Sequence, residues 1–164
     1  MVPRLGQILN CPDQAEVLQR KLSHSIDAAR ARAEAASFRP RVLYLAGLAP
    51  LIGIGGDTYL HELIATAGGI NVTADSAGYP RLSYEDILRL APDVVLLPSM
   101  GGRERAVEAK KRLQRWEHLP AVTQGRVHIV DADRFNRPGP RLVQALETLT
   151  ALLHPRAEAV GKSK

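Results

Sequence analysis

The feature that most constrains the fold is a set of short apolar runs that alternate with amphipathic segments from residue 42 onward. Three such runs, at 42–46, 93–97 and 126–130, have the length of strands, and the second runs without polar alternation, as in a strand covered on both faces. The segments that lie between and after them carry apolar residues at helical spacing. This alternation predicts an α/β fold, a three-layer sandwich with a mostly parallel sheet.

Local signals place the helices of this part at 57–67, 83–90, 103–116 and from about residue 140 onward. Asp57 is expected to cap the first of them, and Ser83 has capping-box spacing with Asp86 in the second. The last helix carries one apolar stripe, made of Leu142, Val143, Leu146, Leu149 and Leu153. Such a stripe predicts a helix that packs on the sheet.

A longer helix is predicted before this part, over 13–36, where no Gly or Pro interrupts. Its apolar stripe consists of Leu18, Leu22, Ile26 and Ala29. At 1.5 Å per residue it would span roughly 35 Å, more than a small domain needs, so it could bridge two bodies. Pro40 ends the helical pattern. We therefore divide the chain into a helical region 1–40, an α/β domain 41–155 and a disordered tail 156–164.

Composition excludes several classes of protein. The chain has 164 residues, 45% of them hydrophobic, and a single cysteine, which suits one domain or one lobe of something larger and excludes a disulfide scaffold. No stretch approaches the ~20 apolar residues of a transmembrane helix. Residues 1–10 lack the apolar core of a secretory signal, so an export signal is not expected in the sequence as written.

The net charge of +5 does not predict nucleic-acid binding, because acidic residues outnumber basic ones over 42–101. The densest basic segment, 103–115, has six basic and two acidic residues at helical spacing, which is typical of a solvated helix face. Aromatic residues make up only 4% of the chain, so stacking surfaces for single strands are scarce.

Catalytic and metal motifs are incomplete. The glycine loop 53–57 has Thr58 where a dinucleotide fingerprint needs its third glycine, and it lacks the Lys of a phosphate loop. It either turns the chain or offers N–H groups to an anion, and a nucleotide-binding enzyme is the least favoured hypothesis. His61-Glu62 is not followed by a second histidine at position 65, and the other histidines are scattered. We expect no enzyme and no metal site built from the protein's own side chains.

Two loop clusters are better candidates for a ligand site. Tyr79-Pro80-Arg81 precedes the helix at Ser83, and 131–140 follows the last strand, at the edge of a parallel sheet where ligands bind. In the second cluster Asp133 and Arg137 flank Phe135, which combines an acceptor, a donor and an apolar face. The alternative is a helix entry whose acid and base satisfy one another, and spacing alone does not decide between the two.

Several motifs, taken in order, resemble a known family. They are Gly56-Asp57-Thr58-Tyr59-Leu60, Ala67-Gly68-Gly69-Ile70-Asn71-Val72, Tyr79-Pro80-Arg81-Leu82-Ser83-Tyr84-Glu85-Asp86-Ile87, Ala91-Pro92-Asp93-Val94-Val95 and Arg137-Pro138-Gly139-Pro140-Arg141-Leu142. They resemble the C-terminal lobe of the ABC-transporter binding proteins for cobalamin and iron siderophores. The resemblance covers about 4–155, and Leu5-Gly6 with the long helix is similar to that family's interlobe helix.

The resemblance implies a two-lobed protein without enzymatic activity that holds cobalamin, a ferric siderophore or a haem-like chelate in its cleft. The metal would arrive inside the ligand, and the loaded protein would dock on a membrane permease. Tyr79, Asp133 and Arg137 match ligand-facing positions of the family, and Glu85 matches an acidic residue that pairs with permease arginines. Arg134 departs from the family, which often has an aromatic residue there.

The chain is therefore expected to be the substrate-binding component, or a truncated lobe of one, of an ABC importer, with its N-terminal lobe absent. The family implies a periplasmic or cell-envelope location, and a cytoplasmic one if the short form is genuine. The alternative is a free-standing α/β interaction module, which would pack its exposed apolar helix stripe on a partner or on a second copy of itself.

Overall fold

The computed structural model describes residues 2–137, 139 and 141–155, and its centre is a four-stranded parallel sheet with the strand order β4-β1-β5-β6. The strands are β1 (Arg41–Tyr44), β4 (Ile70–Asn71), β5 (Val94–Pro98) and β6 (Val127–Val130). β1, β5 and β6 coincide with the three predicted apolar runs to within two residues. The predicted α/β fold with a mostly parallel sheet is confirmed.

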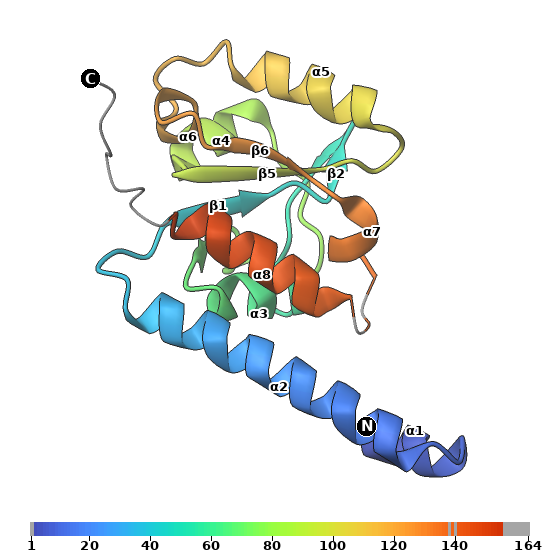
Figure 1. Cartoon of the computed structure of the whole chain (residues 1–164). Coiled ribbons are helices and arrows are strands. Elements are labelled where there is room, and N and C mark those ends of the chain that lie inside the picture. Colours follow the sequence, from blue (N-terminus) through green and yellow to red (C-terminus); the bar gives the residue numbers. More distant parts are fainter. Residues whose placement is uncertain (1, 138, 140, 156–164) are drawn as a thin grey trace, which may run out of the picture.

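Helices cover both faces of this sheet (Figure 1). One face is covered by α3 (Tyr59–Thr66) and α8 (Leu142–Leu153), and α2 (Pro12–Glu34) packs on the outer side of these two helices. The other is covered by α4 (Tyr84–Leu90), α5 (Arg103–Leu113) and α6 (Pro120–Thr123). Short elements complete the described chain: α1 (Val2–Ile8), the antiparallel hairpin of β2 (Gly47–Leu48) and β3 (Leu51–Ile52), and α7 (Ala132–Phe135).

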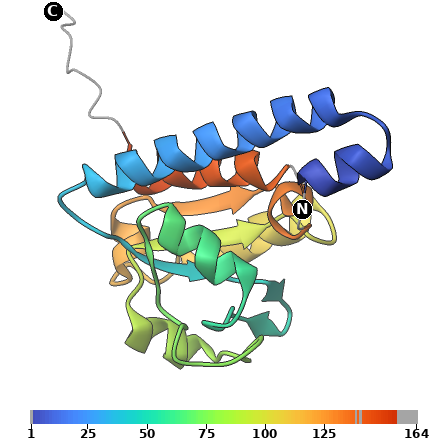
Figure 2. The same cartoon turned by 90° about the horizontal axis from the view of Figure 1, so that it is seen from below.

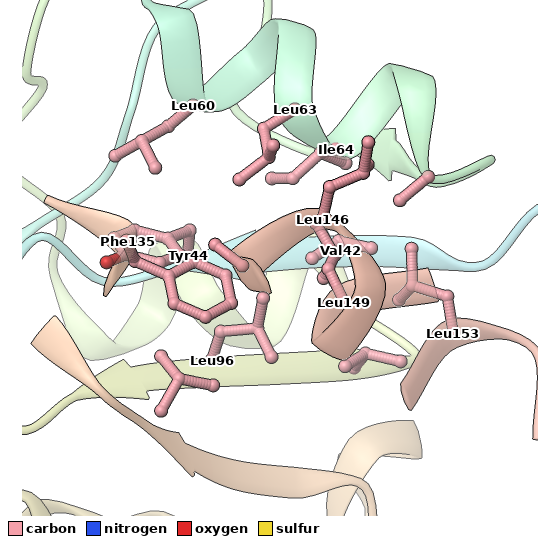
Figure 3. Packing of buried hydrophobic residues seen from close by; sticks show 14 of the residues in the cluster. Val42, Tyr44, Leu60, Leu63, Ile64, Leu96, Phe135, Leu146, Leu149 and Leu153 are labelled. Carbon is pink, nitrogen blue, oxygen red and sulfur yellow. The ribbon is translucent and has the colours of Figure 1, made fainter. Parts of the chain in front are cut away.

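The core is split by the sheet, because successive side chains of a strand point to opposite faces. In β1, Val42 and Tyr44 face α3 and α8, whereas Leu43 faces the other helices, and all three are at most 1% exposed. Figure 3 shows the first of these two clusters, in which Leu146, Leu149 and Leu153 of α8 meet the strands. These are members of the predicted α8 stripe, which is confirmed as the face that packs on the sheet.

The predicted long helix is present as α2, whose 23 residues correspond to roughly 35 Å. Its C-terminal half lies along α8: Ser25 Oγ donates a hydrogen bond to Glu147 Oε1 at 2.9 Å, and the Arg32 guanidinium donates to the carbonyl of His154. Its N-terminal half extends past the sheet, and α1 folds back against it (Figures 1 and 2).

The apolar stripe of α2 is only partly open to solvent. Ala29 is 5% exposed and Ile26 packs against the first core cluster, while Leu18 and Leu22 are half-buried. The interaction-module hypothesis assumed that the whole stripe is exposed, and that assumption is wrong. Packing of α2 on α8 covers the C-terminal half of the stripe because both helices present apolar faces to one another.

The start of α3 also differs from the prediction. The capping residue is Thr58, whose Oγ1 accepts from the His61 N–H at 3.3 Å, and not Asp57. The Asp57 carboxylate instead accepts from the Gly78 N–H at 2.6 Å, a contact between residues 21 positions apart that no local signal predicts. The Ser83–Asp86 capping box of α4 is confirmed, and the backbone N–H and hydroxyl of Ser83 lower the pKa of the Asp86 carboxyl.

The last helix begins at Leu142, within two residues of the predicted start near Pro140, which itself lies outside the described residues. The predicted tail 156–164 also lies outside them.

Candidate functional site

The loops that follow β1, β5 and β6 meet at the carboxyl edge of the sheet, where parallel α/β proteins bind ligands. The backbone N–H of Ala132 donates to Ser99 Oγ at 3.3 Å, which ties the loop after β6 to the loop after β5. Asn136 joins the end of β1 to the loops after β5 and β6: its Oδ1 accepts from the Tyr44 hydroxyl at 2.6 Å and its Nδ2 donates to Met100 Sδ at 3.1 Å. This edge is therefore one connected structure.

Asp133 and Arg137 lie at the surface of this edge, on and just after α7. Arg137 Nη2 is 3.3 Å from Asp133 Oδ1, and the two side chains are 80% and 68% exposed. An ion pair so open to water contributes only about 0–1 kcal/mol, so a ligand can compete for either partner. The two groups pair with one another, and both are exposed enough to reach a ligand, so the geometry suits either sequence interpretation.

Phe135 is not placed as expected. Its side chain is 1% exposed and stacks on Tyr44, with ring centroids 6.1 Å apart and an interplanar angle of 26° (Figure 3). The interpretation of Phe135 as an apolar face open to ligand is therefore wrong. In the single turn of α7 the apolar side chain faces the sheet, because burying an aromatic ring there removes a large apolar surface from water. Phe135 supports the site from beneath.

Tyr79 lies at the same edge, 56% exposed and next to Gly78, whose φ is +60°. The hydroxyl of Tyr59, in the first turn of α3, donates to the Phe135 carbonyl of α7 at 3.0 Å. Burial raises the pKa of Tyr59, and the neighbouring Tyr79 raises it further. Burial likewise raises the pKa of Tyr44, with smaller contributions from Tyr59 and Tyr79. The two loop clusters singled out in the sequence thus lie near one another.

The glycine loop after β3 has no spare N–H groups at its three central glycines. Gly53, Gly55 and Gly56 donate to the carbonyls of Pro80, Gly78 and Ser76 at 2.9, 2.6 and 3.0 Å. A Cβ on Gly55 would lie 2.4 Å from the Ser76 carbonyl oxygen, so glycine is needed for this close approach. The loop therefore holds the segment that carries Tyr79, and the anion-binding interpretation is wrong for these three donors.

Sequence reasoning missed Tyr44, Tyr59, Met100 and Asn136, which connect the loops of this edge. Tyr44 ends β1, Met100 follows β5 and Asn136 follows α7, so the rule that ligands bind at the carboxyl ends of parallel strands also applies to these three. Tyr59 lies in the first turn of α3. Their convergence depends on the strand order, which no local pattern encodes.

Glu85 lies in the first turn of α4 with its side chain exposed. Within the described residues its carboxylate has neither an ion-pair partner nor a side-chain hydrogen bond. The preceding Tyr84 packs edge-on against Trp116, with ring centroids 4.8 Å apart. Glu85 thus presents a free carboxylate at the start of α4, next to Tyr84, which packs this turn of the helix against Trp116.

Neither a metal-binding cluster nor a membrane-spanning helix occurs in the described part of the chain. Over residues 2–137, 139 and 141–155, His, Cys, Asp and Glu nowhere gather in a group of three that could hold a metal ion. The helices of the same residues include none that is long and apolar enough to cross a membrane.

Two curated relatives are named for transport or ligand binding. The Bacillus subtilis protein named uncharacterized ABC transporter substrate-binding lipoprotein YvrC is 33% identical over 101 residues, 62% of this chain and 31% of the relative. The Vibrio cholerae protein named Vitamin B12-binding protein is 31% identical over 125 residues, 74% of this chain and 44% of the relative. The chain thus spans less than half the length of either relative.

A solved structure shares both fold and sequence. The periplasmic heme-binding protein RhuT from Roseiflexus sp. RS-1, in its apo form, aligns with a TM-score of 0.76 and 31% identity, covering 93% of this chain and 60% of that one. The family model described as periplasmic binding protein matches residues 1–134. This chain therefore belongs to the periplasmic binding protein family.

Proposed function

We propose that the chain acts as the C-terminal lobe of the substrate-binding protein of an ABC importer, and that its ligand is a metal chelate such as cobalamin, a ferric siderophore or haem. The observation that supports this most is the likeness to a heme-binding protein over 93% of the chain. The metal would be carried inside the ligand, so the protein would need no metal ligands and would perform no catalysis. Its place of action would be the periplasm or the cell envelope.

The carboxyl edge has the features that such a ligand requires. Tyr79 offers an exposed ring, while Asp133 and Arg137 offer an acceptor and a donor at the surface. Phe135 and Tyr44 form a buried, stacked pair beneath them. Ligand sites bury most of the ligand, which a single open edge cannot do, so a second lobe would supply the other wall and one lobe alone would bind weakly.

Titration with cobalamin, haem and a ferric siderophore tests this function. We expect saturable binding of at least one of them, tighter when an N-terminal lobe is supplied separately. Arg137→Gln should weaken it several-fold through the lost charge-assisted hydrogen bond. Arg115→Gln, an exposed arginine beyond the end of α5, is the matched control and should have no effect. Absence of saturable binding below about millimolar, with or without the second lobe, would contradict the proposal.

Docking on the permease is tested separately at Glu85. A rim carboxylate that steers docking acts on association and leaves the ligand site alone. We expect Glu85→Lys to weaken binding to permease-containing vesicles while the affinity for chelate stays constant. Glu62→Lys is the control, because Glu62 is also an exposed carboxylate in the first turn of a helix, α3, on the other side of the sheet. Equal effects of the two changes would exclude a specific role for Glu85.

A further inference from the structure

A cavity of about 480 Å³ opens at the carboxyl edge, between the β2–β3 hairpin and α5. Its volume lies within the range of small-molecule sites, roughly 300–1,000 Å³. The walls are mainly apolar and are formed by Ala46, Leu48, Ala49, Pro98, Met100 and Ala109. An apolar body, or the apolar part of a larger ligand, fits such walls best.

Three charged side chains also line the cavity, and two of them are already paired. Arg112 Nε is 3.3 Å from Glu108 Oε1, and the Tyr84 hydroxyl together with Glu108 raises the pKa of Arg112. Arg105 lines the cavity one to two turns earlier on α5, next to Gly101. Its guanidinium has no hydrogen-bond or ion-pair partner among the residues that the structure describes. The cavity therefore combines apolar walls with one unpaired positive charge.

This cavity adjoins the candidate site. Met100 is a wall of the cavity, and its sulfur accepts the hydrogen bond from Asn136, the residue before Arg137. A ligand held by Tyr79 and Arg137 would thus have an apolar recess with a cationic side chain beside it. Guanidinium groups pair with carboxylates through two parallel hydrogen bonds, a geometry that an ammonium group cannot reproduce.

We propose that this cavity receives a carboxylate-bearing, otherwise apolar edge of the chelate, and that Arg105 binds the carboxylate. The inference rests on the proposed function and narrows it, because it favours chelates with acidic side chains over cobalamin, whose periphery carries mainly neutral amides. No existing ion pair has to break, since Arg105 is unpaired.

The test compares zinc protoporphyrin, which is diamagnetic and carries two carboxylates, with its dimethyl ester and with cobalamin. We expect the intact chain to bind the free acid more tightly than the ester. Arg105→Gln should weaken binding of the acid by about tenfold, the usual effect of losing a hydrogen bond to a charged group, and leave the ester unchanged. Arg103→Gln is the control, an exposed arginine of the same helix that does not line the cavity.

A second measurement locates the ligand independently of Arg105. The chain has two methionines, Met1 and Met100, so a ¹³C-methyl label gives a simple NMR spectrum in which Met100 reports on the cavity. The Met100 signal should shift on addition of the porphyrin. An unchanged Met100 signal, or equal weakening of acid and ester by Arg105→Gln, would overturn the cavity proposal while leaving the proposed function intact. Absence of binding by every chelate, with or without a separately supplied N-terminal lobe, would overturn both.

Discussion

The two halves of α2 belong to the same helix yet have different surroundings. Residues 25–34 lie along α8, with Ala29 buried in the first core cluster and Arg32 bonded to the end of α8. Residues 12–22 extend beyond the sheet and are accompanied mainly by α1 (Figure 2). One continuous apolar stripe therefore has one half inside the domain core and one half outside it.

This difference indicates what each half does. The C-terminal half contributes to the core and should unfold together with it. The N-terminal half and α1 leave apolar side chains open to water, with Ile8 and Leu9 each 70% exposed and Val17 44% exposed. Under the proposed function this hairpin is where a second lobe would pack, so substitutions there should affect assembly more than the stability of this lobe.

The largest contrast is expected between two Leu→Ala changes. Leu149 of α8 has no exposed surface and packs in the cluster that also contains Ala29, so Leu149→Ala should reduce the free energy of unfolding by about 3 kcal/mol. Leu9→Ala removes the same atoms from a side chain that is 70% exposed, so it should change the free energy of unfolding by less than about 0.5 kcal/mol. Urea unfolding followed by circular dichroism measures both. Similar losses would mean that the hairpin belongs to the same core.

Sequence patterns predicted the elements whose signals are local. The apolar runs of β1 and β5 and the stripe of α8 each report burial directly, and the Ser83–Asp86 spacing reports a cap. The two-residue strand β4 was not predicted, because it exists only through its pairing with β1. The cap at Asp57 was wrong for a related reason: its carboxylate bonds to Gly78, a partner distant in sequence.

The candidate site was predictable only in outline. The rule that ligands bind at the carboxyl ends of parallel strands pointed to residues 131–137, and their role in binding a ligand stays a prediction. The rule cannot tell which side of a one-turn helix faces the sheet, so Phe135 was assigned to the ligand and is found in the core. Nor could it find Arg105, whose position over the cavity depends on how α5 packs.

A smaller contrast is expected between two neighbouring residues in the half of α2 that lies along α8. Ala29 is 5% exposed against the core, whereas Ala28 beside it is exposed. Ala29→Leu forces three extra carbon atoms into a packed interface and should cost about 2 kcal/mol, within the usual range for overpacking. Ala28→Leu should be nearly neutral in the same unfolding experiment. A neutral Ala29→Leu would show that α2 can slide on α8 and is not fixed there.

Stability should also depend on pH through His154, at the end of α8, where Arg32 of α2 packs. Burial lowers the pKa of its imidazole, and the nearby Arg32 and Arg126 lower it further, against an opposing hydrogen bond to the Ala67 carbonyl at 3.0 Å. The unfolded chain therefore binds the proton more readily than the folded one. The stabilisation from neutral His154 is complete above the unfolded value near 6.5 and is lost as the pH falls through the lower folded value.

His154→Gln should therefore flatten the decrease of stability between about pH 7 and pH 5 without abolishing it. A residual slope is expected because burial, Lys110 and Arg126 lower the pKa of His128 as well. His24→Gln, an exposed histidine of α2, is the control and should leave the slope unchanged. If His154→Gln and wild type lose stability in parallel, the imidazole at the end of α8 is not protonated more readily on unfolding.

The smallest effect is expected at Val17, on the half of α2 that extends beyond the sheet. Val17→Ser replaces the two methyl groups of a side chain that is 44% exposed by one hydroxyl, so the free energy of unfolding should stay within about 0.5 kcal/mol of wild type. Hydrogen exchange gives the sharper comparison, because amides of residues 16–22 should exchange through local opening and those of 27–33 only through global unfolding. A loss above about 1 kcal/mol, or equal protection along the whole helix, would mean that α2 is one cooperative unit. The half of α2 that extends beyond the sheet would then be stabilised by this lobe alone, and a second lobe would not be needed to explain its exposed apolar residues.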